Sequence, residues 1–151
     1  MLPKKIIVIL IAEDDAEDRM LIREAFEESQ LKNTVNFVEN GEELLDYLRH
    51  KGKFTDKNKY PTPGLVLLDL NMPKMDGREA LKEIKSDEIL RAIPVVVLTT
   101  SNAQEDVIKT YNLGVSSFIS KPSSFAGLVE ITQMISKYWF ETVELPLIKD
   151  N

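Results

Sequence analysis

Several side chains able to do chemistry stand at the ends of short apolar segments of this sequence. Asp69 follows the run LVLL, and Glu13 and Asp14 follow the run IIVILIA. Thr99 follows the run VVVL, and Lys121 follows the segment SSFIS. A carboxylate at the end of an apolar segment is costly to desolvate unless it is paired. Asp69 therefore has either a structural partner or a chemical role.

Together these residues supply the parts of a phosphoryl-transfer site. Three carboxylates that repel one another favour a cation between them, and oxygen ligands without cysteine or histidine point to Mg²⁺ or a similar ion. The hydroxyl of Thr99 and the ammonium group of Lys121 could bind phosphoryl oxygens. The carboxylate of Asp69 could then attack phosphorus in line, as a nucleophile.

For these residues to meet, the apolar segments must be neighbouring strands of one sheet. Short apolar runs alternate with amphipathic segments along the chain, which predicts strands alternating with helices. The expected strands cover 5–12, 34–40, 65–70, 93–101 and 116–122. The expected helices cover 16–30, 41–52, 102–114 and 123–145, and the segment 78–92 is expected to hold a helix and a connector. Gly52 and Gly114 are the expected C-caps of the second and fourth helices, and Asn102 is the expected N-cap of the fourth.

Five strands alternating with five helices predict an α/β fold whose parallel sheet is covered on both faces. Right-handed crossovers leave few topologies, and the simplest is a doubly wound, flavodoxin-like sheet of strand order 2-1-3-4-5. In that order the first strand lies beside the third, which brings Glu13 and Asp14 next to Asp69. Ligands bind beyond the carboxyl ends of such strands, and all of the candidate residues lie there.

Length and composition limit the class of protein. The chain has 151 residues, 43% of them hydrophobic, which suits one domain over 1–151 with a core at about 5–140. Its formal net charge of −6 argues against nonspecific nucleic-acid binding, which needs a basic surface. Its longest apolar run is too short for a membrane span. The absence of cysteine fits a cytoplasmic protein.

Four motifs resemble the receiver domain of two-component response regulators. They are IAEDD at 11–15, LLDLNMPKMDG at 67–77, VVVLTTS at 95–101 and SKPSS at 120–124. The resemblance implies a protein that accepts a phosphoryl group from a sensor histidine kinase and is not an enzyme in the ordinary sense. Because only PLIKDN follows residue 145, we expect output through contact with a downstream protein or through phosphorelay.

The resemblance also implies a role for each residue around the metal. Asp69 looks like the phosphoacceptor. Glu13 and Asp14 look like the acidic pair near Mg²⁺, with Asp14 the more direct ligand. Asn71 matches the position whose backbone carbonyl binds the metal.

Three further positions match the part of the family pattern that responds to phosphorylation. Thr99 matches the hydroxyl that turns toward the phosphoryl group, and Lys121 matches the lysine that contacts it. The bond between Lys121 and Pro122 is usually cis in such domains. Phe118 stands where the family places its aromatic switch.

A narrower resemblance links the chain to the small stand-alone regulators paired with cyanobacterial phytochromes. It rests on LDLNMPKMDGREAL, VVVLTTS, KPSSF and the terminal YWFETVELP, and on a lengthened loop at 50–64 before the third strand. The single histidine, His50, lies at the start of that loop. We expect it to be solvated and not to carry phosphate.

Consecutive aromatic residues near the end of the chain suggest an interaction surface. Tyr138, Trp139 and Phe140 would lie about 100° apart on a helix, so they cannot all face one core. We expect Tyr138 and Trp139 at an interface, formed by homodimerisation through the fourth helix, fifth strand and fifth helix.

Simpler explanations exist for single residues. Glu13 and Asp14 could cap the first helix and interact with its dipole. Asp69 could form a buried ion pair with Lys121, although such a pair stabilises a fold only weakly.

Two other functions fit part of the pattern. A Mg²⁺-dependent phosphatase of the haloacid dehalogenase type also uses an aspartate nucleophile at a strand end. It requires a second carboxylate two residues later, where this chain has Asn71. An interaction module that is not phosphorylated is the second alternative, and the intact set of strand-end residues argues against it.

Overall fold

Short apolar runs form the centre of the structure, a computed structural model that describes residues 7–146 and 148. Within these residues, five parallel strands form one sheet of order β2-β1-β3-β4-β5, as predicted. The three inner strands are fully buried because helices cover both faces of the sheet. The strands are β1 (Ile9–Ala12), β2 (Val35–Val38), β3 (Leu65–Leu68), β4 (Val95–Thr99) and β5 (Ser117–Ser120).

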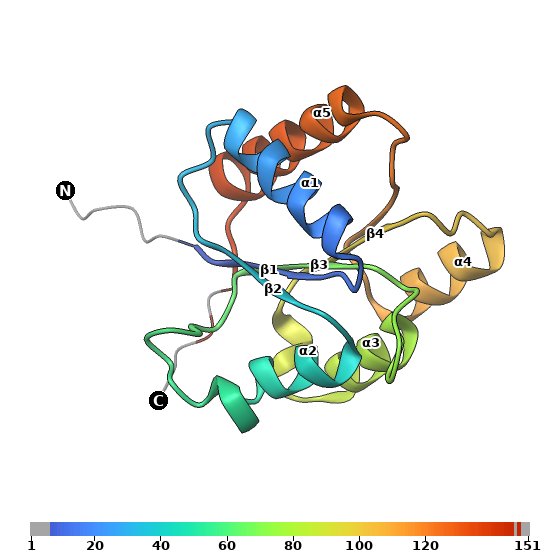
Figure 1. Cartoon of the computed structure of the whole chain (residues 1–151). Coiled ribbons are helices and arrows are strands. Elements are labelled where there is room, and N and C mark those ends of the chain that lie inside the picture. The colour runs from blue at the N-terminus through green and yellow to red at the C-terminus, as the bar shows by residue number, and fades with distance from the viewer. Residues whose placement is uncertain (1–6, 147, 149–151) are drawn as a thin grey trace.

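Helices lie on both faces of the sheet (Figure 1). Helices α1 and α5 lie on one face, and α2 and α3 lie on the other. The α-helices of the described residues are α1 (Ala16–Glu28), α2 (Gly41–Leu48), α3 (Gly77–Ser86), α4 (Gln104–Leu113) and α5 (Phe125–Ser136). Shorter helical segments are η1 (Gly52–Phe54), η2 (Leu90–Ala92) and η3 (Lys137–Thr142).

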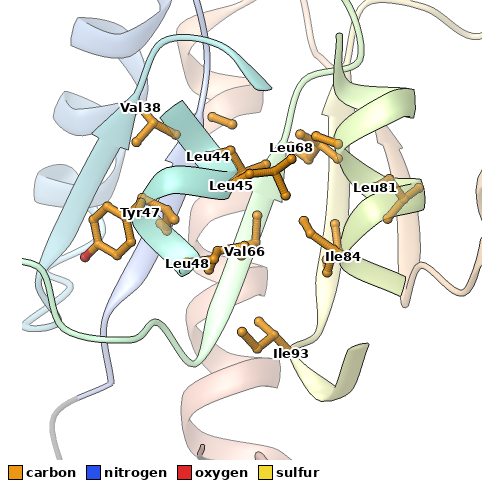
Figure 2. Close-up of a cluster of buried hydrophobic side chains, with 14 of the residues drawn as sticks. Val38, Leu44, Leu45, Tyr47, Leu48, Val66, Leu68, Leu81, Ile84 and Ile93 are labelled. Carbon is orange, nitrogen blue, oxygen red and sulfur yellow. The ribbon is translucent and has the colours of Figure 1, made fainter. Parts of the chain in front are cut away.

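Alternation along each inner strand divides the core into two layers. In β3, Val66 and Leu68 face α2 and α3, whereas Leu65 and Leu67 face α1 and α5, as the period of two requires. Figure 2 shows the first layer, in which leucines of α2 meet β3 and the side chains of Leu81 and Ile84 on α3. The packing of both layers fixes the positions of the strand ends that carry the candidate residues.

Polar N-caps start four of the five α-helices. The side chains of Asp15, Asn40, Asp76 and Ser124 each accept a hydrogen bond from the backbone N–H three residues later. The expected cap of α4 is wrong, because α4 begins after Ala103 and not after Asn102. Gly114 does end α4, with φ of 108°, as predicted.

The second helix is shorter than predicted, because His50 adopts a left-handed backbone with φ of 54° and Lys51 N–H bonds back to the carbonyl of Asp46. Helix α2 ends at Leu48, and Gly52 begins η1 instead of capping α2. The rings of Phe54 and Tyr60 lie 5.3 and 5.7 Å from the ring of Tyr47. His50 was expected to be solvated but is half-buried, with Nε2 3.0 Å from Thr62 Oγ1.

The last predicted helix changes its winding after Ser136. Residues 137–142 form a π-helix, in which Val143 N–H bonds to the carbonyl of Tyr138 five residues earlier. A wider turn rotates successive residues less, and Trp139 and Phe140 both pack against the α1–α5 layer. Tyr138 projects outward with 51% of its surface exposed. At least one aromatic therefore points to solvent, as predicted.

A charged contact joins the first turns of α3 and α4. Arg78 Nε and Nη2 each lie 2.7 Å from a different oxygen of Asp106, and Ser101 Oγ donates to the same carboxylate at 2.7 Å. The hydrogen bonds from Arg78 and Ser101 lower the pKa of Asp106 to about 2.

None of the helices within residues 7–146 is both long and apolar enough to cross a membrane.

Because the folded pKa of Asp106 lies below its ordinary value of 3.8, its contribution to stability is present above about pH 4 and is lost as pH falls toward 2. We expect Asp106→Asn to lower the free energy of unfolding by about 1–2 kcal/mol at neutral pH. The deficit should shrink between about pH 4 and pH 3 in urea titrations. Glu105→Gln, which affects only the exposed pair with Lys109, is the control. A deficit that stays constant with pH would contradict the assignment.

Candidate functional site

The carboxyl ends of four strands meet at one edge of the sheet and bring the predicted residues together. Glu13 follows β1, Asp69 follows β3, Thr99 ends β4, and Lys121 follows β5. Register explains the meeting, because Ala12 pairs with Leu68 and Thr99 pairs with Ser120. The edge therefore holds the acid, hydroxyl and ammonium groups expected from the sequence.

Asp69 is buried and held by neutral donors. Its side chain lies at the tip of β3, and only 7% of the residue is exposed. Thr99 Oγ1 donates to Asp69 Oδ1 at 2.7 Å, and the backbone N–H of Asn71 donates to the same oxygen at 3.3 Å. Lys121 Nζ lies 3.6 Å from the other oxygen, Oδ2. One carboxylate oxygen is thus fixed by hydrogen bonds, and the other has a looser contact with a cation.

Lys121 pairs more closely with other acids than with Asp69. Its ammonium group donates to Glu13 Oε1 and, at 3.2 Å, to Asp18 Oδ2. A simple ion pair between Asp69 and Lys121 therefore does not explain why a carboxylate stands at the end of β3. The lysine instead sits among three carboxylates, within reach of a group attached to Asp69.

Burial and charge set the protonation of this cluster. Burial raises the pKa of Glu13 to about 7; the hydrogen bond from Lys121 opposes this rise, and the charge of Asp69 adds to it. Burial alone would lower the pKa of Lys121, but its hydrogen bond to Glu13 and the charge of Asp69 raise the pKa overall. Lys121 therefore stays charged at neutral pH.

Glu13, Asp14 and Asp69 can bind one cation together. Each offers a carboxylate oxygen, and these oxygens lie within 4.8 Å of one another. Glu13 and Asp69 are buried while Asp14 is exposed, so the cluster opens to solvent on one side. Three carboxylates beside a single ammonium leave excess negative charge, and an oxygen donor set suits a hard divalent cation. Asn71, also exposed, adjoins the cluster through its N–H bond to Asp69.

The acidic pair does not serve as the cap of α1. Asp15 accepts the capping bond from Asp18 N–H at 3.0 Å, which leaves Glu13 and Asp14 to the strand edge. Arg19, a residue the sequence analysis did not single out, donates from Nη1 to the backbone carbonyls of Glu13 and Asp14 at 2.9 and 2.8 Å. The sequence signal that could have identified Arg19 is its position in the first turns of α1, six residues after Glu13 and five after Asp14.

Asp18 is a second residue that the sequence analysis missed. It contacts Lys121 across 103 positions of the chain, and no local pattern reports such a pair. The expected cis bond before Pro122 is wrong, since the described residues contain no cis peptide bond. The trans preference of such bonds is only about 0.5–1 kcal/mol, so sequence alone does not fix the isomer.

The remaining predicted residues lie away from the acidic cluster. Phe118 is half-buried on β5, pairs with Val97 and packs against the α2–α3 layer. Tyr138 is exposed, but Trp139 is partly buried against the α1–α5 layer. Tyr138 is therefore the better candidate for an interface.

Comparison with known proteins agrees with this geometry. The family model described as the response regulator receiver domain matches residues 9–133. The chain is 40% identical over 139 residues to the response regulator Rcp1 of Synechocystis, and the match covers 92% of each chain. It is 43% identical over 133 residues to a probable methanogenesis regulatory protein, FilR2, of Methanothrix harundinacea, covering 87% of this chain and 83% of that one.

Solved structures show the same similarity. The phosphorylated cyanobacterial phytochrome response regulator RcpA superposes with a TM-score of 0.87 at 40% identity, covering 95% of this chain and all (100%) of that one. The Mn²⁺-bound form of Rcp1 superposes with a TM-score of 0.84 at 40% identity, covering 93% and 99%. By its sequence and by its fold, this chain belongs to the response regulator receiver domain family.

Proposed function

We propose that this protein is a response regulator that accepts a phosphoryl group on Asp69 from a sensor histidine kinase and signals through protein contacts. The observation that carries the proposal is the environment of Asp69. Its carboxylate is buried, one oxygen is held by Thr99 at 2.7 Å, and Lys121 is 3.6 Å from the other. A hydroxyl and an ammonium group thus flank the position where a phosphoryl group would be attached.

The transfer step uses groups that are already in place. An oxygen–phosphorus bond forms on Asp69 while the nitrogen–phosphorus bond of a phosphohistidine breaks, and its electron pair stays on the imidazole nitrogen. Thr99 and Lys121 are placed to donate hydrogen bonds to the phosphoryl oxygens. Glu13, Asp14, Asp69 and the backbone carbonyl of Asn71 would hold Mg²⁺, which supplies positive charge to those oxygens when it is bound.

The switch that we propose begins at Thr99. Its hydroxyl now bonds to Asp69, and a phosphoryl group on Asp69 would offer it a stronger, charged acceptor. Thr99 pairs with Ser120 and adjoins the β4–α4 loop, so its movement would reach β5. Phe118 on β5 is only half-buried and can change its packing. Phosphorylation would in this way shift the population of two surfaces around α4.

Two alternatives receive less support from the residues. A haloacid dehalogenase-type phosphatase needs an acid where this chain has Asn71, which contributes its backbone N–H to Asp69. A module that is never phosphorylated would not need the acidic cluster to be kept beside Thr99 and Lys121.

The kinase partner is proposed to be of the phytochrome type. This rests on the named relatives, since RcpA is described as a cyanobacterial phytochrome response regulator.

A groove beside the site, between α1 and the β5–α5 loop, is lined by Leu21, Lys121, Pro122 and Phe125 among others. Met20 on α1 and Phe125 are exposed by 52% and 43%. Apolar surface next to the phosphoacceptor suits a kinase helix that must bring its histidine close.

Incubation with radiolabelled acetyl phosphate and Mg²⁺ should label the wild-type protein on Asp69. Asp69→Asn should lose the label, because an amide oxygen is a poor nucleophile toward phosphorus. Asp56→Asn, in the exposed loop before β3, is the matched control and should label normally. Equal labelling of the Asp69 variant and the wild type would disprove the assignment.

Isothermal titration calorimetry with Mg²⁺ or Mn²⁺ should show one metal-binding site per chain. Asp14→Asn should weaken binding by about tenfold or more, because it removes one carboxylate ligand. Glu17→Gln removes an exposed acid nearby on α1 and should change the affinity little. Wild-type protein that binds neither ion at neutral pH, or equal losses in the two variants, would reject the metal assignment.

We also propose homodimerisation through the face formed by α4, β5 and α5. Exposed apolar side chains on or near this face are Ile108, Tyr111 and Tyr138, each exposed by 49–52%. Sedimentation velocity over a concentration series should show a dimer that Tyr138→Ala weakens. Met20→Ala, on α1, is the control. Trp139 is not substituted because it packs against the core. A wild-type protein that stays monomeric throughout would refute the dimer.

A further inference from the structure

The contact between Arg78 and Asp106 has no part in the transfer step, yet it lies beside the site. Arg78 binds both carboxylate oxygens of Asp106 in a forked geometry, with two distances of 2.7 Å. Ser101 Oγ is a third donor to that carboxylate, at 2.7 Å. The side chain of Asp106 is 15% exposed and that of Arg78 is 34% exposed, so solvent screens the pair only in part. Forked pairs of this kind fix the positions of both partners.

This contact joins the two segments that carry Asp69 and Thr99. Helix α3 begins at Gly77, where an added Cβ would lie 2.3 Å from the backbone oxygen of Asp69. Arg78 therefore follows a residue packed directly against the phosphoacceptor. Ser101 comes two residues after Thr99. Through Asp106, the first turn of α4 is thus tied to Arg78, at the start of α3, and to Ser101, in the loop after Thr99.

A phosphoryl group on Asp69 would act on the two partners in opposite directions. The hydrogen bond to Asp106 is the main cause of the raised pKa of Arg78, and the charges of Asp106, Asp76 and Asp69 add to it. Phosphorylation of the Asp69 carboxylate raises the negative charge at this position from one to about two. This charge would attract Arg78 and repel Asp106, and so weaken the contact between them. Movement of Thr99 toward the phosphoryl group would also pull on the loop that holds Ser101.

We propose that Arg78, Asp106 and Ser101 form a latch that holds the β4–α4 loop and the first turn of α4 in the unphosphorylated arrangement. The latch rests on the proposed function of Asp69 and describes its regulation. Because the latch exists mainly in the unphosphorylated state, opening it by substitution shifts the equilibrium toward the phosphorylated arrangement. A ligand that binds that arrangement then binds more tightly.

The test uses beryllium trifluoride with Mg²⁺, which mimics a phosphoryl group on a carboxylate. Affinity is measured for the wild type, Asp106→Asn, Arg78→Gln and the double variant. We expect each single variant to bind the mimic about threefold to tenfold more tightly, the range for a partly exposed forked ion pair. The double variant should gain no more than the better single variant, because the two residues act as one contact.

The matched control is Glu105→Gln, which removes an acid from the same first turn of α4 whose ion pair, among the described residues, is with Lys109. Its affinity for the mimic should stay within about twofold of wild type. Equal tightening by this control would show a general effect of charge at the start of α4, and would overturn the latch.

Two other results would overturn it. Unchanged affinity together with a lower melting temperature in both single variants would make the contact a structural tie present in both states. Weaker binding by Arg78→Gln would mean that Arg78 contacts the phosphoryl mimic itself. A wild-type protein that does not bind the mimic at all would instead refute the proposed function of Asp69, so the two failures are distinguishable.

Discussion

The structure depends on one constraint, which is the burial of a carboxylate at the end of an inner strand. Asp69 is 7% exposed, yet its hydrogen-bond donors are the hydroxyl of Thr99 and a backbone N–H. Neither donor neutralises its charge. Lys121 Nζ lies 3.6 Å from the second oxygen of Asp69, but it donates to Glu13 and Asp18. The site therefore keeps excess negative charge that a divalent cation could balance, and a carboxylate oxygen that is not tightly bound.

The fold provides the site by geometry alone. In a parallel sheet all carboxyl ends lie at one edge, and the order β2-β1-β3-β4-β5 places β1 next to β3. The acids that follow β1 then lie beside Asp69, which follows β3. Thr99 lies at the end of β4 and Lys121 just after β5. Helices α3 and α4 begin at the same edge, and their first turns are joined through Arg78 and Asp106.

Sequence reasoning succeeded where a local pattern carries the information. Apolar runs predicted the inner strands, and the residues just after them were predicted to meet at one edge of the sheet, because strand ends and sheet edges follow from the alternation itself. Sequence reasoning failed where contacts between distant residues, or the exact end of a helix, had to be predicted. Helix α2 ends early, at Leu48, and Tyr47 packs against Phe54 and Tyr60 beyond that end. The contact of Lys121 with Asp18, and the turn of α4 beginning after Ala103, likewise had no local signal.

The central claim is that the phosphoryl group is carried by the side chain of Asp69, and its most direct test is chemical mapping. Protein treated with acetyl phosphate and Mg²⁺ is reduced with borohydride, which converts an acyl phosphate to an alcohol, and its peptides are sequenced by mass spectrometry. The account predicts the reduced residue at position 69 alone. Reduction at Glu13 or Asp14 in its place, or at no carboxylate of this edge, would contradict it.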